Sequence, residues 1–409
     1  MKGGIYMAIF YGVKVRNRRS IMIQLIVCIF ICTIMGGRPD FFWAEENLSM
    51  YSASYALADG DTGRVLKGKK EEEPMANAST TKILTCIVTL ENCSLEEVVT
   101  VSAKAVSQPK VRLGMKEGAT YTLKELLYGL MLESYNDCAV AIAEHVAGST
   151  EAFAKLLNQK AKEIGCKDTY FITPNGLDAT DEYGFHHTTA SDLCRMMAYC
   201  TWESPQKEEF LKITQTRNFG SFVNRNSFLN QMEGVLSGKT GFTNKAGYCY
   251  VAAMEINGER YCIALLACGW PNNKTYKWKD ARTLFEYGME NYTQKRVKID
   301  IAERQMRING YIENADLIEL NRENTLRISA KSKEYQILMS DEEKIHTEIV
   351  LYTDTKLPIK EGQIMGVCNI YLDDTYVDSF PLYACTSANI WGWRSVFHTI
   401  FYQFLTFSL

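Results

Sequence analysis

The sequence lacks the marks of a nucleic-acid-binding or metal-dependent protein. Its 45 lysines and arginines are outnumbered by 48 aspartates and glutamates, whereas nucleic-acid binding usually needs a concentrated basic surface. There are five histidines, and neither an H-E-x-x-H sequence nor a cysteine pair with metal-ligand spacing occurs. A G-x-S-x-G turn is missing too. We therefore expect no nucleic-acid partner, no metal, no cofactor and no serine–histidine–aspartate triad.

The spacing of the 13 cysteines does not indicate disulfide pairs either. Cys28 and Cys32 lie in the N-terminal segment described next, which leaves eleven, an odd number. Several of these, such as Cys86, Cys138 and Cys262, stand within apolar runs, where a thiol behaves as a small buried hydrophobe. An exported protein can oxidise cysteines, but we predict mostly buried thiols and no particular pair.

One short apolar run near the N-terminus has the layout of an export signal. Residues 21–35 are mostly apolar, and they follow a basic cluster made of Lys14, Arg16, Arg18 and Arg19. A basic flank and a short apolar core are typical of a secretory signal, and this run is short for a bilayer span. Ala44 fits a cleavage point, but Phe42 departs from the small-x-small rule. We expect residues 1–44 to be a signal peptide or an uncleaved N-terminal anchor.

Residues 45–294 combine strand and helix patterns. Two strand patterns flank the turn-rich residues 59–63, and Asn257-Gly258 joins two further β-rich runs as a hairpin. Several helix patterns lie between them. One begins at Thr122, whose spacing to Glu125 matches a capping box, and it is expected to break at 133–135. This order predicts an α/β (α+β) domain whose helices pack on an antiparallel sheet.

The C-terminal part has a different texture. Short alternating segments between turn-rich spacers predict a small all-β domain over residues 295–386. Residues 387–409 follow, with apolar side chains at helical spacing: Trp391, Trp393, Phe397, Ile400, Phe401, Phe404 and Leu405. An aromatic-rich amphipathic helix at a chain end is typical of an interfacial membrane anchor. A helix docked on the β domain is the alternative, but few comparable apolar partners remain there.

Ser79 and Lys82 are the first candidate chemical groups. They stand three residues apart in a predicted helix over 79–90, so they share one face. A serine is a weak nucleophile until a neighbouring base removes its proton. A lysine can be that base only when burial or nearby positive charge lowers its pKa, and the apolar surroundings indicate burial. Taken alone, a helix cap followed by a surface lysine would be the better explanation.

A second polar group, Ser134-Tyr135-Asn136, falls in the expected break between two apolar helices. Polar side chains in a buried kink need hydrogen-bond partners, and a cleft shared with Ser79 would supply them. The ordinary explanation of this triplet is an N-cap at Asn136.

A third group is Lys239-Thr240-Gly241, followed by Phe242-Thr243. A lysine and a hydroxyl on one strand edge can bind a carboxylate. Gly241 would let a substrate backbone lie close to the strand. A surface strand leading to a turn explains this triplet equally well when it is considered alone.

Together the three groups resemble the S-x-x-K, S-x-N and K-T-G set of penicillin-binding proteins and serine β-lactamases. The segment 74–82 is similar to the nucleophile segment of the low-molecular-mass D-alanyl-D-alanine carboxypeptidases, the S11 peptidase family. Residues 136–139, 173–178 and 186–192 resemble further landmarks of that family. The resemblance covers roughly residues 55–292. One departure is Tyr135, where glycine or alanine is more usual; another is the order Pro-Met-Ala-Asn-Ala before Ser79.

The resemblance implies a DD-peptidase/β-lactamase-like fold and a role for each residue. Ser79 would attack the carbonyl between two D-alanines, and Lys82 would take its proton. Ser134 and Asn136 would relay a proton to the leaving amine and hold the substrate amide, with electrostatic support from Lys239. The substrate-binding residues would be Lys239, Thr240, Gly241, Phe242 and Thr243. Of these, Thr240 and Thr243 would bind the terminal carboxylate, and the Phe242 N–H would form an oxyanion hole with the Ser79 N–H.

The same resemblance implies partners and a location. Peptidoglycan peptide stems would be the substrates, and β-lactams would acylate Ser79 as inhibitors. The C-terminal helix would bind the membrane surface. The protein would be exported and would act at the outer face of the cytoplasmic membrane or in the cell wall.

Three alternatives use the same groups. A class A β-lactamase would also need a glutamate that activates the deacylating water, and no clear E-x-x-x-N segment lies between the second and third motifs. A non-catalytic penicillin-binding wall module should lack one of the groups, and none is missing. A DD-endopeptidase that acts on cross-links would share the entire site.

Overall fold

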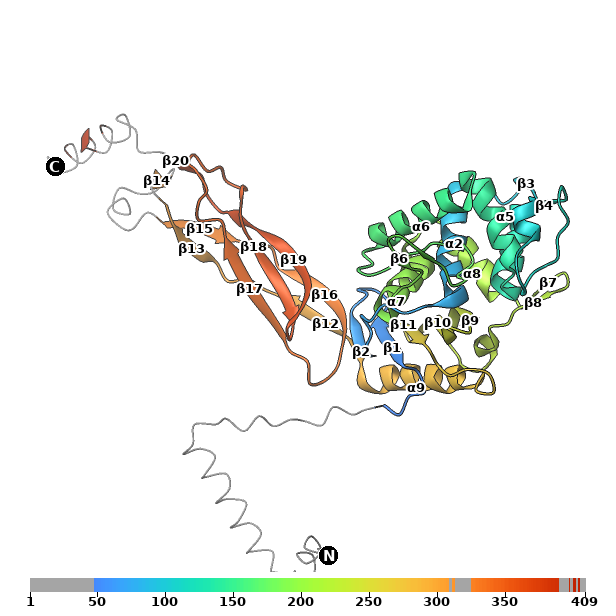
Figure 1. Ribbon diagram of the computed structural model, residues 1–409. Helices are drawn as coiled ribbons and strands as arrows, with labels where there is room; N and C mark the ends of the chain where they lie inside the picture. Colours follow the sequence, from blue (N-terminus) through green and yellow to red (C-terminus); the bar gives the residue numbers. More distant parts are fainter. Residues whose placement is uncertain are drawn as a thin grey trace, which may run out of the picture. The chain divides into compact units, whose positions relative to one another are not determined.

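The computed structural model describes residues 48–308, 311–312 and 325–389, together with Phe397, Ile400, Phe401 and Phe404 (Figure 1). The predicted signal peptide or anchor, residues 1–44, lies outside the described residues. So do Trp391, Trp393 and Leu405 of the predicted terminal helix. Within the described parts of the chain, no helix has both the length and the apolar character needed to cross a membrane.

A five-stranded antiparallel sheet forms the base of the first domain. Its strands, in spatial order, are β2 (Val65–Lys69), β1 (Ser54–Asp59), β11 (Glu259–Leu266), β10 (Gly247–Ile256) and β9 (Val235–Thr243). Both predicted hairpins are present, between β1 and β2 and between β10 and β11. Because β1 pairs with β11, the two ends of the domain meet in one sheet, and β9 is left at its edge.

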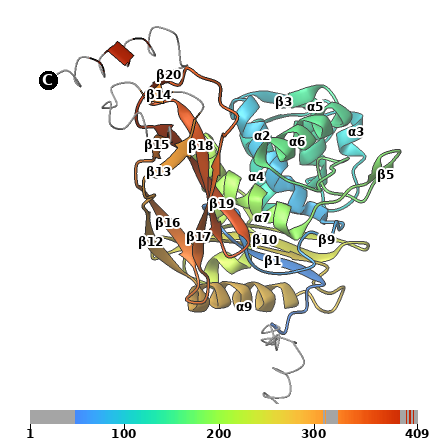
Figure 2. The same cartoon turned by 90° about the vertical axis from the view of Figure 1, so that its left-hand side faces the viewer.

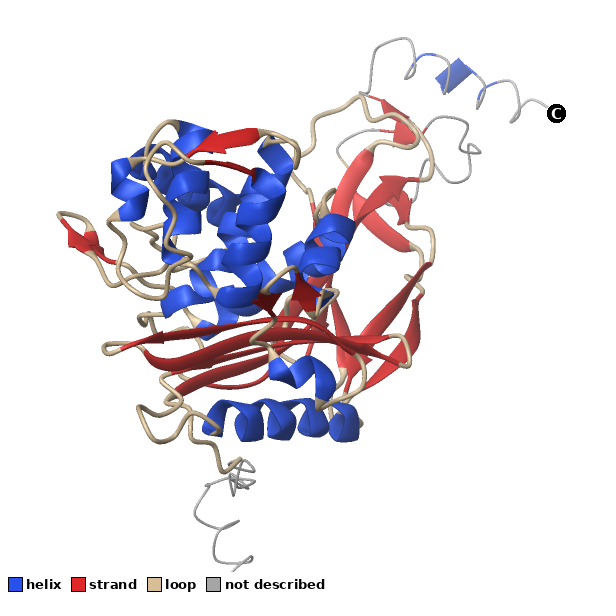
Figure 3. Cartoon of the chain, turned by 90° about the vertical axis from the view of Figure 1, so that its right-hand side faces the viewer, coloured by secondary structure: helices blue, strands red, loops and turns tan. Residues whose placement is uncertain are grey.

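Helices cover both faces of this sheet (Figure 3). On one face α9 (Tyr276–Asn291) packs on β10 and β11. On the other, α7 (Ala190–Ala198) packs on β1, β10 and β11. The remaining helices lie on the α7 side: α2 (Lys82–Asn92), α3 (Ala103–Val106), α4 (Leu123–Tyr128), α5 (Asn136–Ala147), α6 (Thr150–Ile164) and α8 (Lys207–Gln215). The predicted α+β class, with helices on an antiparallel sheet, is confirmed.

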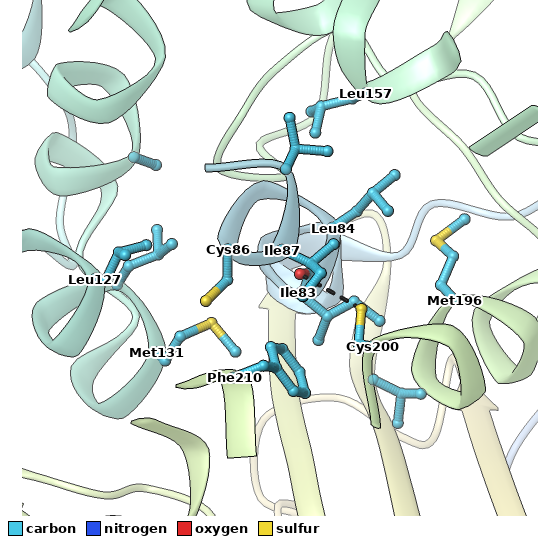
Figure 4. Packing of buried hydrophobic residues seen from close by; sticks show 14 of the residues in the cluster. Ile83, Leu84, Cys86, Ile87, Leu127, Met131, Leu157, Met196, Cys200 and Phe210 are labelled. Carbon is cyan, nitrogen blue, oxygen red and sulfur yellow. Dashed lines mark hydrogen bonds between the residues drawn. The ribbon is translucent and has the colours of Figure 1, made fainter. Parts of the chain in front are cut away.

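Helix α2 lies at the centre of the helical layer. Every residue from Lys82 to Leu90 is buried. Side chains on all faces of α2 therefore pack against other elements of the protein. Figure 4 shows Ile83, Leu84, Cys86 and Ile87 surrounded by side chains of other elements, among them Leu127, Met131, Leu157, Met196, Cys200 and Phe210. This packing fixes α2 and therefore fixes the lysine at its first residue.

The predicted helix over 79–90 differs at its start. Residues Ala78–Thr81 form a 3₁₀ turn, η1, and the α-helix begins only at Lys82. Ala78 has a φ of 50°, in the left-handed region, so the chain turns sharply just before Ser79. The left-handed residue directly before Ser79 therefore sets the direction from which the chain enters the 3₁₀ turn.

The predicted break between two helices is present. Thr122 and Glu125 form the capping box that starts α4. A π-helical turn, η2 (Gly129–Glu133), follows, and Ser134 then adopts a left-handed conformation with a φ of 65°. Helix α5 begins at Asn136 and ends before Gly148, as expected. The turn therefore places Ser134 and Asn136 two positions apart, and Asn136 reaches Lys82 at the start of α2.

The C-terminal part is all-β, as predicted (Figure 2). Its five-stranded sheet has the order β13 (Arg304–Arg307), β15 (Thr325–Ser329), β19 (Thr375–Ala384), β18 (Ile364–Leu372) and β17 (Ile345–Leu351). A second pair joins β12 (Thr293–Ile299) to β16 (Lys333–Met339), and a third joins β14 (Tyr311–Ile312) to β20 (Ala388–Asn389). Strand β12 starts two residues before the predicted boundary at 295. Leu326, Ile328, Met365 and Leu382 are fully buried in a separate core.

The cysteines of the described residues are all free, and most of them are buried. Burial raises the pKa of the Cys86 and Cys194 thiols, which therefore stay protonated. The expectation that most of the cysteines are buried is confirmed for the described part of the chain.

Candidate active site

Ser79 lies in a turn that is held by the side chain of Asn77 and by close packing against Gly176. Asn77 donates from its side-chain amide to the hydroxyls of Thr80 and Thr81, at 3.0 and 2.9 Å. Gly176 has a φ of 80°, and a Cβ at this position would lie 1.9 Å from the Ala78 carbonyl oxygen. Only glycine fits at this position. Because it has no side chain, the loop that contains Asn175 can pack closely against the turn of Ser79.

His186 also supports this turn, as a neutral side chain. Burial lowers the pKa of its imidazole to about 3. Its Nδ1 accepts from the Ile172 N–H at 3.0 Å, so Nε2 carries the proton and donates it to the Thr81 hydroxyl at 2.9 Å. The imidazole therefore positions Thr81 and does not act as the base.

Lys82 is placed to act on Ser79. Its Nζ lies 2.7 Å from the Ser79 Oγ, and it donates to Asn136 Oδ1 at 2.9 Å and to the Asn175 carbonyl at 2.8 Å. The side chain is completely buried. Burial, followed by the positive charge of Lys239, holds the pKa of Lys82 well below its usual value of 10.5. A lysine with a lowered pKa can accept the proton of the serine hydroxyl.

Lys239 makes the corresponding contact with Ser134. Its Nζ donates to the Ser134 Oγ and to the Thr240 carbonyl, each at 2.9 Å. Only 2% of the lysine is exposed. Burial, followed by the charge of Arg225, lowers its pKa to about 7. If the Ser134 hydroxyl donates its proton to another group, the Lys239 amine can therefore supply a new proton to the Ser134 oxygen.

The structure brings the five predicted catalytic residues together. Ser79, Lys82 and Asn136 form one hydrogen-bonded chain, and Ser134 and Lys239 form another. Ser134 and Asn136 belong to the same turn. Only Tyr135 separates them in the sequence, so the backbone of this turn links the two hydrogen-bonded groups. The ring of Tyr135 packs edge-on against Phe222, with centroids 5.6 Å apart.

The edge strand β9 carries the residues predicted to bind substrate. Thr240 is half-buried and pairs with Tyr250, while Phe242 is exposed and pairs with Tyr248. Gly241 also lies against the protein's own backbone. A Cβ there would come within 3.0 Å of the Asn77 carbonyl oxygen and the Ser79 nitrogen, so the glycine lets β9 pack against the turn of Ser79.

Thr243, predicted to bind the terminal carboxylate together with Thr240, already has hydrogen-bond partners within the protein. Its hydroxyl donates to Asp178 Oδ1 and accepts from the Ala246 N–H, both at 3.0 Å. A hydroxyl has one proton to donate, and here it is given to Asp178. Thr240 is therefore the better candidate for binding a substrate carboxylate.

Comparison with known proteins identifies the family. Residues 42–267, more than half of the chain, match the family model described as D-alanyl-D-alanine carboxypeptidase. Residues 318–388 match the C-terminal domain of penicillin-binding protein 5. The chain belongs to the D-alanyl-D-alanine carboxypeptidase family. It is a low-molecular-mass penicillin-binding protein and a serine-type carboxypeptidase.

Individual relatives agree with this assignment. The D-alanyl-D-alanine carboxypeptidase DacF of Bacillus subtilis (strain 168) is 28% identical over 360 residues, which cover 83% of this chain and 86% of the relative. Penicillin binding protein 5 from Haemophilus influenzae has the same fold, with a TM-score of 0.64 at 22% identity over 85% of this chain and 100% of that one. The cefotaxime-bound penicillin-binding protein D2 from Listeria monocytogenes has a TM-score of 0.54 at 25% identity, over 60% of this chain and 100% of that one.

The motifs of this carboxypeptidase did not reveal two contributors to the site. The Asn175 carbonyl accepts from Lys82 and, at 3.3 Å, from the Ser79 hydroxyl. A backbone carbonyl has no side-chain signal, although Gly176 beside it was visible within the 173–178 landmark. Asp137 is the second contributor. Its buried carboxylate accepts from the Leu113 and Gly114 N–H groups at 2.9 and 2.8 Å and holds that loop beside the site.

A third residue that sequence reasoning missed is Arg225. Its Nε donates to Glu133 at 2.7 Å, and its charge helps to lower the pKa of Lys239. Arg225 lies 14 positions before Lys239 in a region without a recognised motif, so only the fold brings the two cations together. Its half-exposed guanidinium adds positive charge beside β9.

The contacts of the nucleophile bear on the β-lactamase alternative. In the part of the chain that the structure describes, Ser79 and Lys82 bond to each other and to amide oxygens, and no carboxylate is hydrogen-bonded to either. A class A enzyme needs a glutamate to activate the water that releases the acyl group.

Proposed function

We propose that this carboxypeptidase removes the terminal D-alanine of peptidoglycan stem peptides through an acyl-enzyme on Ser79, and that β-lactams acylate the same hydroxyl. One observation carries the proposal: the buried amine of Lys82 lies 2.7 Å from the Ser79 Oγ, inside a network that also includes Asn136. The cefotaxime-bound form of the similar Listeria protein supports the second part.

Acylation begins when neutral Lys82 takes the proton of Ser79. The Ser79 Oγ then attacks the carbonyl carbon of the scissile bond, and the negative oxygen that forms needs hydrogen-bond donors. The N–H groups of Ser79 and Phe242 are the proposed donors, because the Gly241 contact places the two segments side by side. Loss of one such donor typically slows acyl transfer by about 100–1000-fold.

Departure of D-alanine requires a proton on its nitrogen. Ser134 gives its hydroxyl proton to the leaving amine as the C–N bond breaks, and Lys239 at 2.9 Å supports that transfer. Asn136 is held by Lys82 through its Oδ1, while its Nδ2 donates to the Pro109 carbonyl at 3.2 Å. Asn136 can therefore hold a substrate amide in a fixed orientation. Water then hydrolyses the ester on Ser79.

The terminal carboxylate of the substrate is proposed to bind beside β9. Thr240 supplies a hydroxyl, while Lys239 and Arg225 supply positive charge in the same region. A hydroxyl donor beside basic side chains is a suitable receptor for a carboxylate. Such a receptor would favour a substrate with a free chain end. An endopeptidase that cuts cross-links would use the same chemical groups, and its substrate would also need space along the β9 edge.

The function is tested by incubating the purified protein with a pentapeptide that ends in D-Ala-D-Ala. We expect release of free D-alanine and, with the chromogenic cephalosporin nitrocefin, one slow acylation per chain. Rapid multiple turnover of nitrocefin would instead identify a β-lactamase. If the folded protein released no D-alanine, a non-catalytic penicillin-binding wall module would be favoured instead.

Membrane attachment through the C-terminal helix is a second proposal. The four described residues of this helix, Phe397, Ile400, Phe401 and Phe404, are all apolar and are between 57% and 75% exposed. Their spacing places them on one helix face. An exposed aromatic face of this kind fits insertion into the headgroup region of a membrane. It also fits the location expected from the sequence, the outer face of the cytoplasmic membrane or the cell wall.

We expect deletion of residues 391–409 to move the protein from the membrane fraction to the soluble fraction. The deletion leaves strand β20 intact, so D-alanine release should be unchanged. The double substitution Phe401→Asp and Phe404→Asp should act in the same direction, whereas His398→Ala, which removes no apolar area, should not. Membrane association that persists after the deletion would assign anchoring to the N-terminal segment.

A further inference from the structure

A cluster of metal-ligating side chains lies outside the catalytic network. The Sγ of Cys93, a carboxylate oxygen of Glu97 and a ring nitrogen of His145 are all within 4.8 Å of one another. The catalytic mechanism uses none of these groups. Position 145 is far from 93 and 97 in the sequence, which is why no metal site was expected from residue spacing.

Two helices that start in the active site end at this cluster. Helix α2 begins at Lys82 and has Cys93 as its C-cap; helix α5 begins at Asn136 and has His145 in its last turn. A helix of 11 residues is about 16 Å long, so the cluster lies at the opposite end of these helices from the catalytic groups. Glu97 comes from the segment that leads into β3 (Val98–Thr100).

Hydrogen bonds within the protein hold the Glu97 carboxylate beside His145 before any ion binds. Glu97 accepts from the Ser94 N–H through one oxygen, at 2.6 Å, and contacts His145 Nε2 through the other, at 2.9 Å. The Leu123 N–H, at the start of α4, donates to the Glu97 carbonyl at 2.9 Å. His145 and Cys93 stand on helix ends. A site held in this way needs little ordering when it binds a ligand.

The ligand types agree with one class of ion, and the three ligand atoms, within 4.8 Å of one another, are close enough to converge on it. Zinc bonds to sulfur at about 2.3 Å and to nitrogen or oxygen at about 2.0–2.2 Å, so a tetrahedral shell separates its ligand atoms by roughly 3–4 Å. Thiolate and imidazole ligands suit borderline-soft cations, whereas calcium and magnesium prefer oxygen alone. Three protein ligands leave the fourth position to water.

The helix ends give an independent reason for a cation. The last carbonyl groups of a helix carry partial negative charge, which stabilises positive charge near the C-terminus. Both α2 and α5 direct their C-termini to this cluster. Two converging helix C-termini and a carboxylate therefore favour a positive ion at this place.

We propose that Cys93, Glu97 and His145 bind Zn²⁺, or a divalent cation of similar softness, with a water molecule as the fourth ligand. On binding, the Cys93 thiol loses its proton to solvent, and the imidazole keeps one proton, on Nδ1, so that Nε2 is free to bind. The carboxylate binds as it stands. The bound ion joins the C-terminal ends of α2 and α5 and so stabilises the two helices that carry Lys82 and Asn136.

The test uses the full-length protein, purified in detergent, with Zn²⁺ and Co²⁺ as probes. We expect one zinc ion per chain after dialysis, and a thiolate-to-cobalt charge-transfer absorption when Co²⁺ is added. Cys93→Ser, Glu97→Gln and His145→Gln should each weaken zinc binding by at least about tenfold, because even the loss of a supporting residue around a metal site typically costs 10–100-fold. Cys93→Ser should also remove the charge-transfer absorption.

Cys385→Ser is the matched control. Cys385 is another half-buried cysteine, its thiol donates a hydrogen bond to the Ser329 hydroxyl at 3.1 Å, and it is remote from the cluster in sequence. It should bind zinc like the original protein. Zinc should raise the melting temperature of the original protein but not that of Glu97→Gln, whose substituted side chain is 42% exposed and leaves the core intact. Penicillin acylation, measured without added zinc, reports that each variant is folded. Absence of stoichiometric binding in the original protein, or equal binding in the three variants, would overturn the proposal.

Discussion

Replacement of Ser79 by alanine is expected to abolish covalent labelling by penicillin and release of D-alanine. The substitution removes the atom that lies 2.7 Å from the Lys82 amine, and no acyl-enzyme can form without it. In a well-studied serine protease the loss of the nucleophile costs on the order of 10⁶ in kcat, and we expect a loss of comparable size. Mass spectrometry after incubation with penicillin measures the adduct, and peptide mapping locates it.

The fold should survive this change, because the Ser79 hydroxyl makes only a long bond of 3.3 Å to the Asn175 carbonyl besides its contact with Lys82. Ser237→Ala is a suitable control. Ser237 is buried on the same strand, β9, as Lys239, and its hydroxyl has no hydrogen-bond partner among the described residues. Its removal should leave labelling intact. An adduct retained in Ser79→Ala, or mapped to another residue, would refute the assignment of the nucleophile.

The sequence contained the residues of the site but not the contacts that position them. Ser79 and Lys82 could be paired from spacing alone, because positions three apart share a face in a 3₁₀ turn as well as in an α-helix. The break at Ser134 was visible from the polar residues between two apolar helices. The role of Gly241 could not be inferred, since it depends on the approach of a turn about 160 residues earlier in the chain.

Backbone groups and distant charges were the least accessible to sequence reasoning. The Asn175 carbonyl, the Asp178 carboxylate that takes the Thr243 proton, and the guanidinium of Arg225 act through tertiary contacts. The same limit applies to the β domain. In β16 a polar first half is followed by three buried apolar residues, so the strand shows no alternation. This segment is identified as a strand only by its antiparallel pairing with β12.

The second large effect is expected from Asn136→Asp, which tests whether Lys82 acts as a neutral base. In the present structure, burial and the charge of Lys239 hold the pKa of Lys82 well below 10.5, so penicillin acylation should rise with pH to a plateau that begins well below that value. Aspartate has nearly the same shape as asparagine but would place a negative charge about 2.9 Å from the Lys82 amine. An opposite charge at this range typically moves a pKa by about 1–3 units.

The sign of the effect follows from the state that the carboxylate favours. It stabilises the ammonium form, so the pKa of Lys82 rises and a smaller fraction of the base is neutral at pH 7. Acylation at pH 7 should fall by about 10–1000-fold and should recover as the pH is raised. Asn136→Ala is the control: it removes the same bond without adding charge, so its loss of rate should not be recovered in this way. Equal losses in both variants at every pH would mean that Asn136 only holds the substrate, and that the charge state of Lys82 does not limit the attack by Ser79.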